Sequence, residues 1–240
     1  MSVASEITRL QNAKASLKTS INAKTDQQHQ ITTETLDNYA NFVDSITIGG
    51  SKLPTEYIAV NYIQSSGTQY IDTNYKINAN TKFHIKCSQY RTAGGQIFGA
   101  RENDFWYNLY SRSGKVAFGY NSTRVDFNIS TGDYVFEDFT ADSTSVVINN
   151  EVHNDITINQ FPDYTLYLFA ANTNGTPTEF SKSRIGRVKI YENEVLIRDY
   201  VACRRISDSM LGLYDVINNV FYVNQGSSSF SSGGDIIYNY

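Results

Sequence analysis

Cysteine is scarce in this chain, which has only Cys87 and Cys203 among its 240 residues. Two cysteines are too few for a disulfide framework, and their wide separation excludes the short spacing at which cysteines hold a structural metal ion. We therefore expect both thiols to be reduced and buried in a core.

Charge is sparse as well. Charged residues make up 18% of the chain, the net charge is −4, and no basic cluster occurs. Proteins that bind nucleic acids or anionic membranes do so largely through clustered Lys and Arg side chains that displace counterions. Neither a nucleic acid nor a membrane is therefore expected as a partner.

Long apolar runs are missing too. No stretch approaches the roughly 18 residues that a membrane-spanning helix needs. Residues 1–10 lack the charged and apolar regions of a signal peptide, so we expect synthesis in a cytoplasm. Tyrosine, in contrast, is abundant, with 18 residues against a single tryptophan. This composition favours strands and turns.

Residues 1–48 contain neither proline nor glycine. Within them, Ile7, Leu10, Leu17 and Ile21 recur at helical spacing, which places them on one stripe of a helix. The stripe is short and polar in places, so the isolated helix would be marginally stable. We expect it to need a partner helix and to serve oligomerisation or anchoring, with a homotrimer as the expected assembly.

A second, shorter helical pattern occupies residues 36–46. It is followed by Gly49-Gly50-Ser51 and then by a proline, which is the composition of a flexible joint. The sequence therefore predicts an α-helical segment over residues 1–50 and a separate domain over residues 51–240.

Beyond Glu56 the hydrophobic pattern changes from helical to alternating, which is typical of strands. About ten to thirteen short strands in a domain of this size indicate an antiparallel sandwich or barrel. Asn149 and Asn193 stand at hairpin turns, where a positive φ is required. The clearest expected strands are Ile58–Ile63, Thr68–Thr73, Thr81–Gln89, Phe105–Tyr110, Lys115–Tyr120, Tyr134–Ala141, Thr144–Ile148, Thr165–Ala170, Arg187–Tyr191 and Val195–Val201.

Motifs at both ends of the strand-rich domain match a known family. The stretch Tyr62–Thr73 (YIQSSGTQYIDT) resembles the opening strand pair of concanavalin-A-like, or laminin-G-like, jelly-roll domains in phage and prophage structural proteins of Gram-positive gut bacteria. The stretches 184–191 and 198–205, followed by 212–226, resemble the closing strands of that family. This resemblance implies a mainly β fold, a two-sheet antiparallel jelly-roll sandwich, preceded by the helical segment.

The helical start adds a second resemblance. Ile31–Tyr39 (ITTETLDNY) is similar to the short helical segment that precedes binding modules in phage tail and virion appendage proteins. Together the two resemblances imply a virion protein that contacts other virion proteins through its N-terminal helices. The expected location is the virion, where the domain is exposed on the released particle.

Catalysis is not expected from the carboxylates. Glucanases of this wider fold need a nucleophile and an acid about 5 to 5.5 Å apart on one strand face. Glu102 and Asp104 begin such a pattern, but Trp106 and Tyr107 stand where the second glutamate should be. We therefore expect no catalytic residues and no enzyme.

No cofactor is expected either. His29, His84 and His153 are scattered, and none stands at metal-ligand spacing from a cysteine or carboxylate. Calcium stays open, because lectin-like domains of the resembled fold often hold an ion through loop Asp, Asn and carbonyl oxygens with no fixed spacing.

Carbohydrate binding needs an aromatic face for stacking and planar polar side chains for hydroxyl groups. On an alternating strand, Trp106, Asn108 and Tyr110 share one face. A second candidate set follows at Tyr120, Asn121 and Arg124. The sequence favours the simpler interpretation of these residues, namely that Trp106 is a buried core aromatic and that the tyrosines are ordinary strand residues.

The favoured hypothesis is a phage virion appendage protein whose lectin-like domain binds a bacterial surface glycan. Several copies on one particle would raise the avidity of a weak site. Oligomerisation through the N-terminal helices would supply these copies. The alternative is a purely structural capsid or tail decoration or fibre protein without a ligand. A glycoside hydrolase comes third.

The oligomer hypothesis predicts different masses in solution for the full chain and for a variant that lacks residues 1–50. Because the apolar stripe lies in the deleted part, light scattering should give a multimer for the full chain and a monomer for the variant. Two monomers would contradict homo-oligomerisation and would indicate that the helices dock onto another protein.

Overall fold

The computed structural model describes residues 53–89, 94–112, 114–127 and 134–236. The expected N-terminal helices, including the stripe Ile7, Leu10, Leu17 and Ile21 and the boundary near residue 50, lie outside these residues. The described residues form strands, turns and loops. Among them, no helix is long and apolar enough to cross a membrane.

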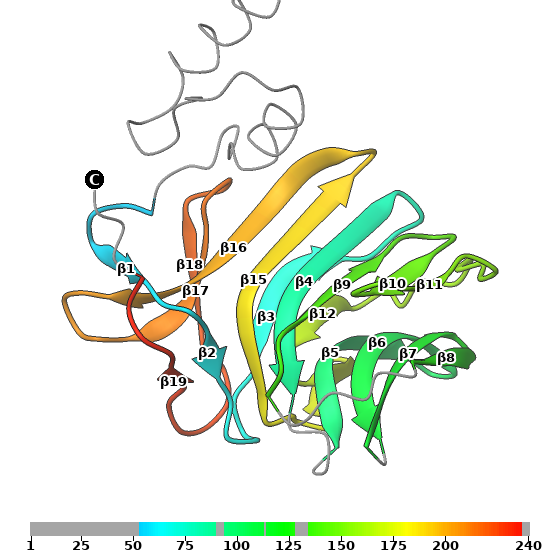
Figure 1. The fold of residues 1–240 in the computed structure, drawn as a ribbon, viewed down its shortest axis with the longest axis horizontal. Helices are drawn as coiled ribbons and strands as arrows, with labels where there is room; N and C mark the ends of the chain where they lie inside the picture. Colours follow the sequence, from blue (N-terminus) through cyan, green and yellow to red (C-terminus); the bar gives the residue numbers. More distant parts are fainter. Residues whose placement is uncertain (1–52, 90–93, 113, 128–133, 237–240) are drawn as a thin grey trace, which may run out of the picture. The chain divides into compact units, whose positions relative to one another are not determined.

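Two β-sheets pack face to face (Figure 1). The path of the larger sheet is β11-β10-β9-β4-β15-β16-β17-β18, with β1 on β16, β2 on β15 and β19 on β2. Its strands are β1 (Tyr57–Ala59), β2 (Ile63–Gln64), β4 (Thr81–Gln89), β9 (Glu137–Ala141), β10 (Val146–Ile148), β11 (Glu151–His153), β15 (Ser183–Glu192), β16 (Val195–Arg205), β17 (Leu211–Asp215), β18 (Val220–Val223) and β19 (Ser231–Ser232).

The path of the smaller sheet is β14-β13-β5-β6-β7-β8, and β12 joins it by pairing with both β5 and β3. Its pairs are antiparallel except β13 with β5, which is parallel. The expected antiparallel two-sheet sandwich is therefore present, with one parallel pair that the sequence did not predict. Its strands are β3 (Ile71–Lys76), β5 (Gly95–Glu102), β6 (Phe105–Arg112), β7 (Lys115–Asn121), β8 (Thr123–Phe127), β12 (Thr165–Leu168), β13 (Ala171–Thr173) and β14 (Thr176–Thr178).

Phenylalanine rings join the two sheets. Phe83 of β4 and Phe98 of β5 have ring centroids 4.5 Å apart, and Phe139 of β9 lies 5.3 Å from Phe118 of β7. All four side chains are fully buried. Aromatic pairs at these separations add to the burial of apolar area that drives sheet packing. This cluster forms the centre of the core.

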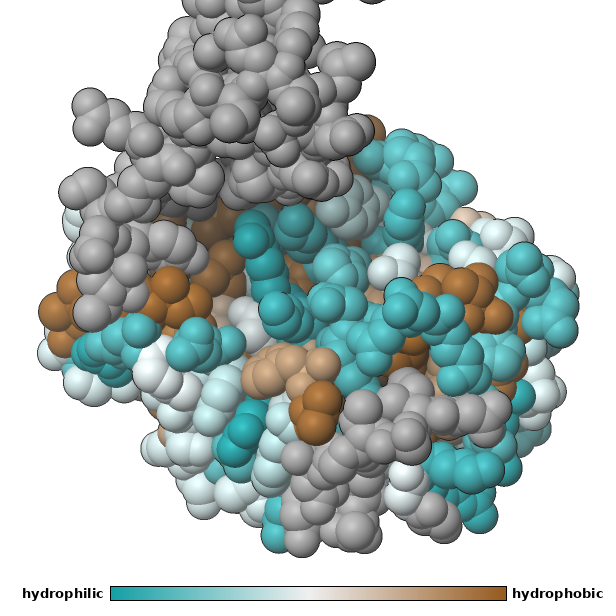
Figure 2. All heavy atoms as spheres, in the orientation of Figure 1, coloured by the Kyte–Doolittle hydropathy of each residue, from teal (hydrophilic) through white to brown (hydrophobic). Residues whose placement is uncertain are grey.

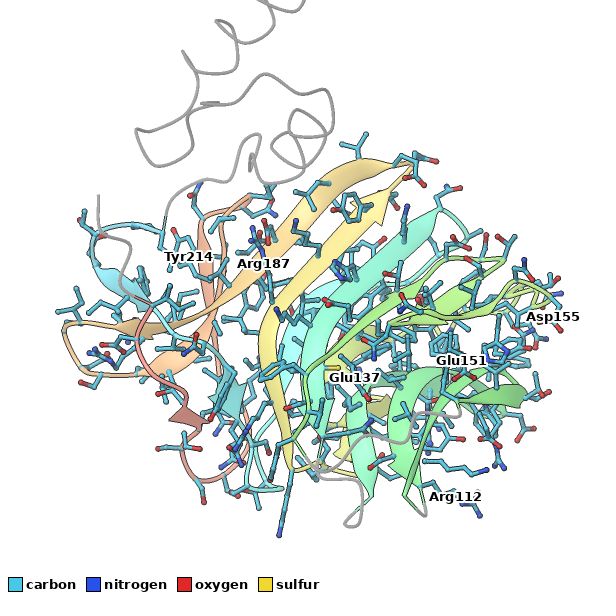
Figure 3. The ribbon with its side chains drawn as sticks, in the orientation of Figure 1. Arg112, Glu137, Glu151, Asp155, Arg187 and Tyr214 are labelled. Atoms are coloured by element: carbon cyan, nitrogen blue, oxygen red, sulfur yellow. The ribbon has the colours of Figure 1, made fainter. Side chains whose placement is uncertain are left out.

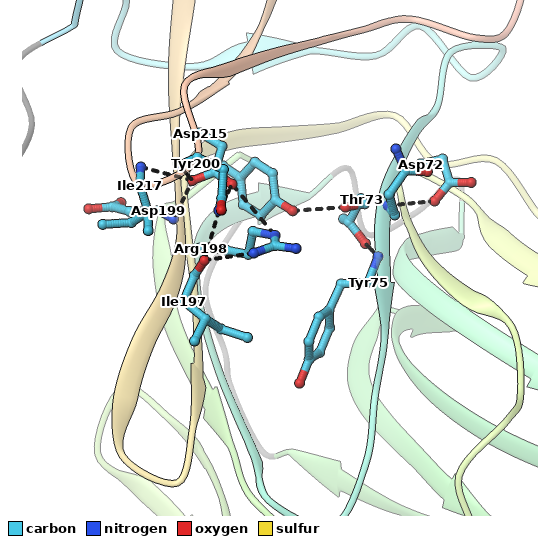
Figure 4. Close-up of polar contacts among 11 residues, drawn as sticks. Asp72, Thr73, Tyr75, Ile197, Arg198, Asp199, Tyr200, Asp215 and Ile217 are labelled. Carbon is cyan, nitrogen blue, oxygen red and sulfur yellow. Dashed lines mark hydrogen bonds and ion pairs between the residues drawn. The ribbon is translucent and has the colours of Figure 1, made fainter.

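A hydrogen-bond network at one end of the sandwich also joins the sheets (Figure 4). The Tyr200 hydroxyl, on β16, donates to the carbonyl of Thr73 on β3 at 3.0 Å. Burial raises the pKa of Tyr200, so that this hydroxyl stays protonated. Beside it, the fully buried Asp215 carboxylate accepts the backbone N–H groups of Asp199 and Ile217, each at 3.1 Å.

The outer face of the larger sheet is polar. On β4 and β15, alternate residues leave the core, so that Lys82, His84, Lys86, Arg187 and Lys189 share this face. Figure 2 shows hydrophilic surface over these strands. His84 lies 3.4 Å from the Asp138 carboxylate, and burial holds its pKa below the usual value. His84 is therefore a surface residue of strand β4.

Several expectations from the sequence are confirmed at residue level. Strand β4 has the bounds expected for it. Asn149 and Asn193 take φ angles of 52° and 51° at their hairpin turns. Cys87 and Cys203 are buried thiols.

The stretch 62–73, which the sequence predicts to be an opening pair of strands, has a different structure. Residues 65–70 form a loop, and the strand starts at Ile71. The reason is the buried side chain of Gln69, whose Oε1 accepts the Ser66 N–H at 2.8 Å and whose Nε2 donates to the Ser229 carbonyl at 2.9 Å. Strands β2 and β3 also belong to different sheets, so they do not form a pair with each other.

Four other strands are shorter than expected. Strand β12 ends at Leu168 instead of Ala170, because Phe169 takes a φ of 67°. Residues 58–63 are split into β1 and β2, and β9 starts at Glu137 instead of Tyr134. Strand β10 starts at Val146, because the Asp142 carboxylate accepts the N–H groups of Thr144 and Ser145, each at 2.8 Å, and so forms a turn there. Strand β5 was not expected at all.

Replacing Phe83 with alanine should destabilise the sandwich, since it removes a buried ring that contacts the opposite sheet. Changes of this kind cost about 3–5 kcal/mol of unfolding free energy. Urea unfolding followed by circular dichroism measures the loss. Val195→Ala is the control, because Val195 is 62% exposed and its truncation should change stability by less than about 0.5 kcal/mol. Similar losses in both variants would contradict the central position of the phenylalanine cluster.

Candidate functional site

An open depression lies on the solvent-facing side of the smaller sheet. Its volume is about 550 Å³, within the size range of small-molecule sites. Its residues come from β5, β6, β8 and the loops next to them, and the Glu179 side chain joins from the segment that follows β14. The lining residues are Gly95, Gln96, Arg101, Trp106, Asn108, Tyr110, Ser111, Arg112, Ser122, Thr123, Arg124 and Glu179.

The alternation of β6 directs the key side chains into this depression. Tyr107 and Leu109 point into the core and are buried, so Trp106, Asn108 and Tyr110 lie on the outer face. Asn108 pairs with Gly99 on one side and with Gly119 on the other.

The two glycines leave space beside Asn108. A Cβ on Gly119 would collide with the Asn108 amide and would lie 2.9 Å from Cδ1 of Trp106. A Cβ on Gly99 would lie 3.0 Å from Cβ of Asn108. Because neither position has a side chain, the Trp106 ring and the Asn108 amide can lie close to the backbone of the sheet.

Trp106 is held by one hydrogen bond and one cation. Its Nε1 donates to the carbonyl of Thr123 at 2.9 Å, and the Arg101 guanidinium lies 5.7 Å from the centre of its rings. The indole is partly exposed and does not belong to the buried core. The interpretation favoured by the sequence, that Trp106 is a buried core aromatic, is therefore wrong.

Arg101 is fixed by polar contacts on both sides. Its Nη1 donates to Oε1 of Glu179 at 2.6 Å, and its Nη2 donates to Oε2 at 3.3 Å, which makes a bidentate pair. The Asn108 amide, in the orientation that satisfies its neighbours, accepts from Nε and Nη2 of Arg101, both at 3.0 Å. Gln96, which is 1% exposed, donates to Oε2 of Glu179 at 2.6 Å.

Two more arginines stand at the edge of the depression. Arg124 on β8 forms a 3.1 Å ion pair with Asp126, and both side chains are about half exposed. Arg112 is exposed at the end of β6, and its side chain extends away from the core (Figure 3). Within the part of the chain that the structure describes, Arg112 has no ion-pair partner.

Four of the six residues proposed from the sequence line the depression, namely Trp106, Asn108, Tyr110 and Arg124. Tyr120 does not, because its ring packs against the core and stacks on Phe118 at 6.1 Å.

Asn121 also lies outside the lining residues. Its side chain holds the segment before β12 by donating to the Thr157 carbonyl at 2.9 Å and accepting the N–H groups of Asn159 and Gln160 at 3.2 and 3.1 Å. It is therefore a positioning residue for that loop.

The sequence missed Gln96, Arg101 and Glu179. Arg101 pairs directly with Trp106 across the turn between β5 and β6, so a predicted β5 would have placed it in the site. Glu179 lies 78 positions after Arg101 and follows a different strand, and no local pattern signals their contact.

The depression contains one carboxylate among its twelve lining residues, Glu179, and Arg101 holds it. Glycoside hydrolysis ordinarily needs two carboxyl groups. Glu102, the other candidate, accepts the Asp163 N–H at 2.7 Å and so fixes a loop. Over the described residues, no group of three His, Cys, Asp or Glu side chains could hold a metal ion.

Comparisons with known proteins give little more. No protein-family model matches the chain, and a search of curated proteins finds no relative. Among solved structures, the chain is similar to a native heptameric SAP-like pentraxin from Limulus polyphemus, with 10% sequence identity and a TM-score of 0.44. The match covers 74% of this chain and 94% of that one. A similarity at this level supports no inference about binding or assembly.

Replacing Gly119 with alanine should disturb the depression, since the new methyl group would displace the Asn108 amide and the Trp106 ring. Trp106 is the only tryptophan, so the emission spectrum reports its surroundings directly and should change. Overpacking of this kind lowers the free energy of unfolding by about 1–3 kcal/mol. Thr176→Ala, at an exposed position of the same sheet, is the control and should change neither quantity. An unaltered Trp106 spectrum in Gly119→Ala would refute the close packing described above.

Proposed function

We propose that the β-sandwich is a carbohydrate-binding module and that its site is the depression around Trp106. The observation that carries this proposal is the combination of a partly exposed indole with planar polar groups that are already held in place. Saccharides present apolar C–H faces and rings of hydroxyl groups, and these two features need those two kinds of partner.

The polar groups are arranged before any ligand binds. The bidentate contact of Arg101 with Glu179 and the amide of Asn108 fix the guanidinium next to the indole. Glu179 remains 48% exposed, so its carboxylate can still accept hydrogen bonds from sugar hydroxyls. Pre-organised groups lose little conformational entropy on binding, which favours affinity from a small contact area.

We further propose that the module is an appendage of a phage particle and binds a bacterial surface glycan. The support is the resemblance of the stretches 62–73, 184–191 and 198–205 to jelly-roll domains of phage structural proteins. In this proposal the N-terminal segment oligomerises or anchors the chain, and several copies raise the avidity of a weak saccharide site.

A purely structural role in the particle is the second candidate. The observation that favours it is that the guanidinium group of Arg101 already donates hydrogen bonds within the chain, to Glu179 and Asn108. Such a network also stabilises a domain that has no ligand. The two candidate functions predict different results when the chain is tested for binding to fractions of the host cell surface. Only the carbohydrate-binding function predicts that one of them is bound.

Saccharide binding should change the Trp106 emission. Titrating the chain with cell-wall polysaccharide fractions from Gram-positive gut bacteria should give a saturable shift for at least one fraction. Trp106→Ala should weaken binding of that fraction about tenfold or more, because central aromatic residues dominate binding energy in such sites. Calorimetry measures the variant, which has no tryptophan.

Tyr191→Ala is the matched control, since Tyr191 is a partly exposed aromatic on the outer face of the other sheet. Its affinity should equal that of the unaltered chain. Equal weakening in both variants would contradict the assignment of the site. Absence of binding to every fraction, combined with particle assembly that depends on the chain, would favour the structural role. Release of reducing sugars would indicate an enzyme instead.

A further inference from the structure

We propose that the ligand of this depression is a saccharide with an anionic substituent, and that Arg112 and Arg124 bind the anionic group. The inference rests on the proposed function and names the class of glycan that the site takes. The shared chemistry is an oxyanion on a sugar, whether a carboxylate or a phosphodiester.

The charges that line the depression are unbalanced. Three arginines, Arg101, Arg112 and Arg124, face a single carboxylate, that of Glu179. The Glu179 carboxylate already forms a bidentate pair with Arg101, with contacts of 2.6 and 3.3 Å. Two guanidinium groups therefore remain to attract an anion, on a chain whose net charge is −4. Local charge of this kind selects ligands of the opposite sign.

Arg112 faces a like charge and not an acidic partner. Its partner across the β6–β7 hairpin is Lys115, and both residues are exposed. Like charges directly opposite each other destabilise an antiparallel pair. An anion bound beside Arg112 would relieve this repulsion, and a planar guanidinium is well suited to bind a carboxylate or phosphate in a bidentate manner.

Arg124 is available in spite of its ion pair. Its contact with Asp126 is 3.1 Å long, and the two side chains are 44% and 46% exposed. An exposed pair of this kind is screened by solvent and is worth little. The Arg124 guanidinium can therefore exchange Asp126 for an anionic ligand without a large loss of stability.

Tyr110 lies between these groups and the indole. It occupies the same face of β6 as Trp106, and its partner on β7 is the small Ala117. A sugar ring can therefore contact the aromatic side chains while its anionic substituent reaches the arginines at the edge. A nucleic acid would offer both stacking and phosphate, but single-strand binding needs a positively charged groove that follows the backbone over several nucleotides, and only two of the three arginines that line this depression are not held by Glu179.

The test is an array of neutral saccharides together with their carboxylated and phosphorylated counterparts, probed with the full chain. We expect the anionic members of matched pairs to be bound at least about tenfold more tightly than the neutral ones, as a charge-assisted pair allows. The difference should shrink when salt is raised from about 0.05 M to about 0.5 M. The carboxylated and phosphorylated arms identify the anionic group.

The double variant Arg112→Gln/Arg124→Gln should lose this preference and keep its binding of neutral saccharides. Arg205→Gln is the matched control, because Arg205 is a partly exposed arginine on the larger sheet and pairs with Asp208 there. It should keep the preference. Since all three side chains are exposed or partly exposed, the unfolding midpoint should be unchanged in every variant.

The outcomes separate this inference from the proposed function. Binding of neutral saccharides alone, or a preference for anions that survives the double variant, would overturn the inference and leave carbohydrate binding intact. Binding of no saccharide would overturn both. Tighter binding of single-stranded DNA than of any saccharide would also overturn both.

Discussion

The contact between the phenylalanine rings of the two sheets is the constraint on which the rest of the structure depends. The rings of Phe83 and Phe98 meet across the sandwich at an interplanar angle of 49°, and Phe118 and Phe139 extend the contact. Because strand residues alternate between faces, the choice of inward residues also decides which residues face outward. A slip of one residue on β6 would exchange Tyr107 for Trp106 and remove the depression. The core therefore sets the register of the site.

The sequence allowed prediction of those features that depend on local patterns. The alternation of residues 105–110 placed Trp106, Asn108 and Tyr110 on one face, and the turn at Asn193 followed from the tolerance of asparagine for positive φ. The bounds of β4 followed from its regular alternation.

The features that escaped prediction depend on contacts between distant segments. Strand β5 was missed because Gly95 and Gly99 interrupt its pattern, and Arg101 was missed with it. The strand expected over residues 68–73 failed because the Gln69 side chain, a long-range partner of Ser229, holds a loop there. Three of the four members of the polar network in the depression, Gln96, Arg101 and Glu179, were therefore missed, and only Asn108 was predicted.

The backbone of Glu179 has a further consequence. Its φ is 50°, in the left-handed region that glutamate rarely adopts and that costs on the order of 1 kcal/mol or more. Asparagine or glycine would adopt this φ more easily, but neither reaches Arg101 and Gln96 with a carboxylate. The strained backbone of Glu179 and the contacts of its carboxylate with Arg101 and Gln96 therefore act on stability with opposite signs. A glycine at position 179 would relax the backbone, but it would leave the buried Gln96 amide without this acceptor, so the glutamate is retained at the cost of an unfavourable φ.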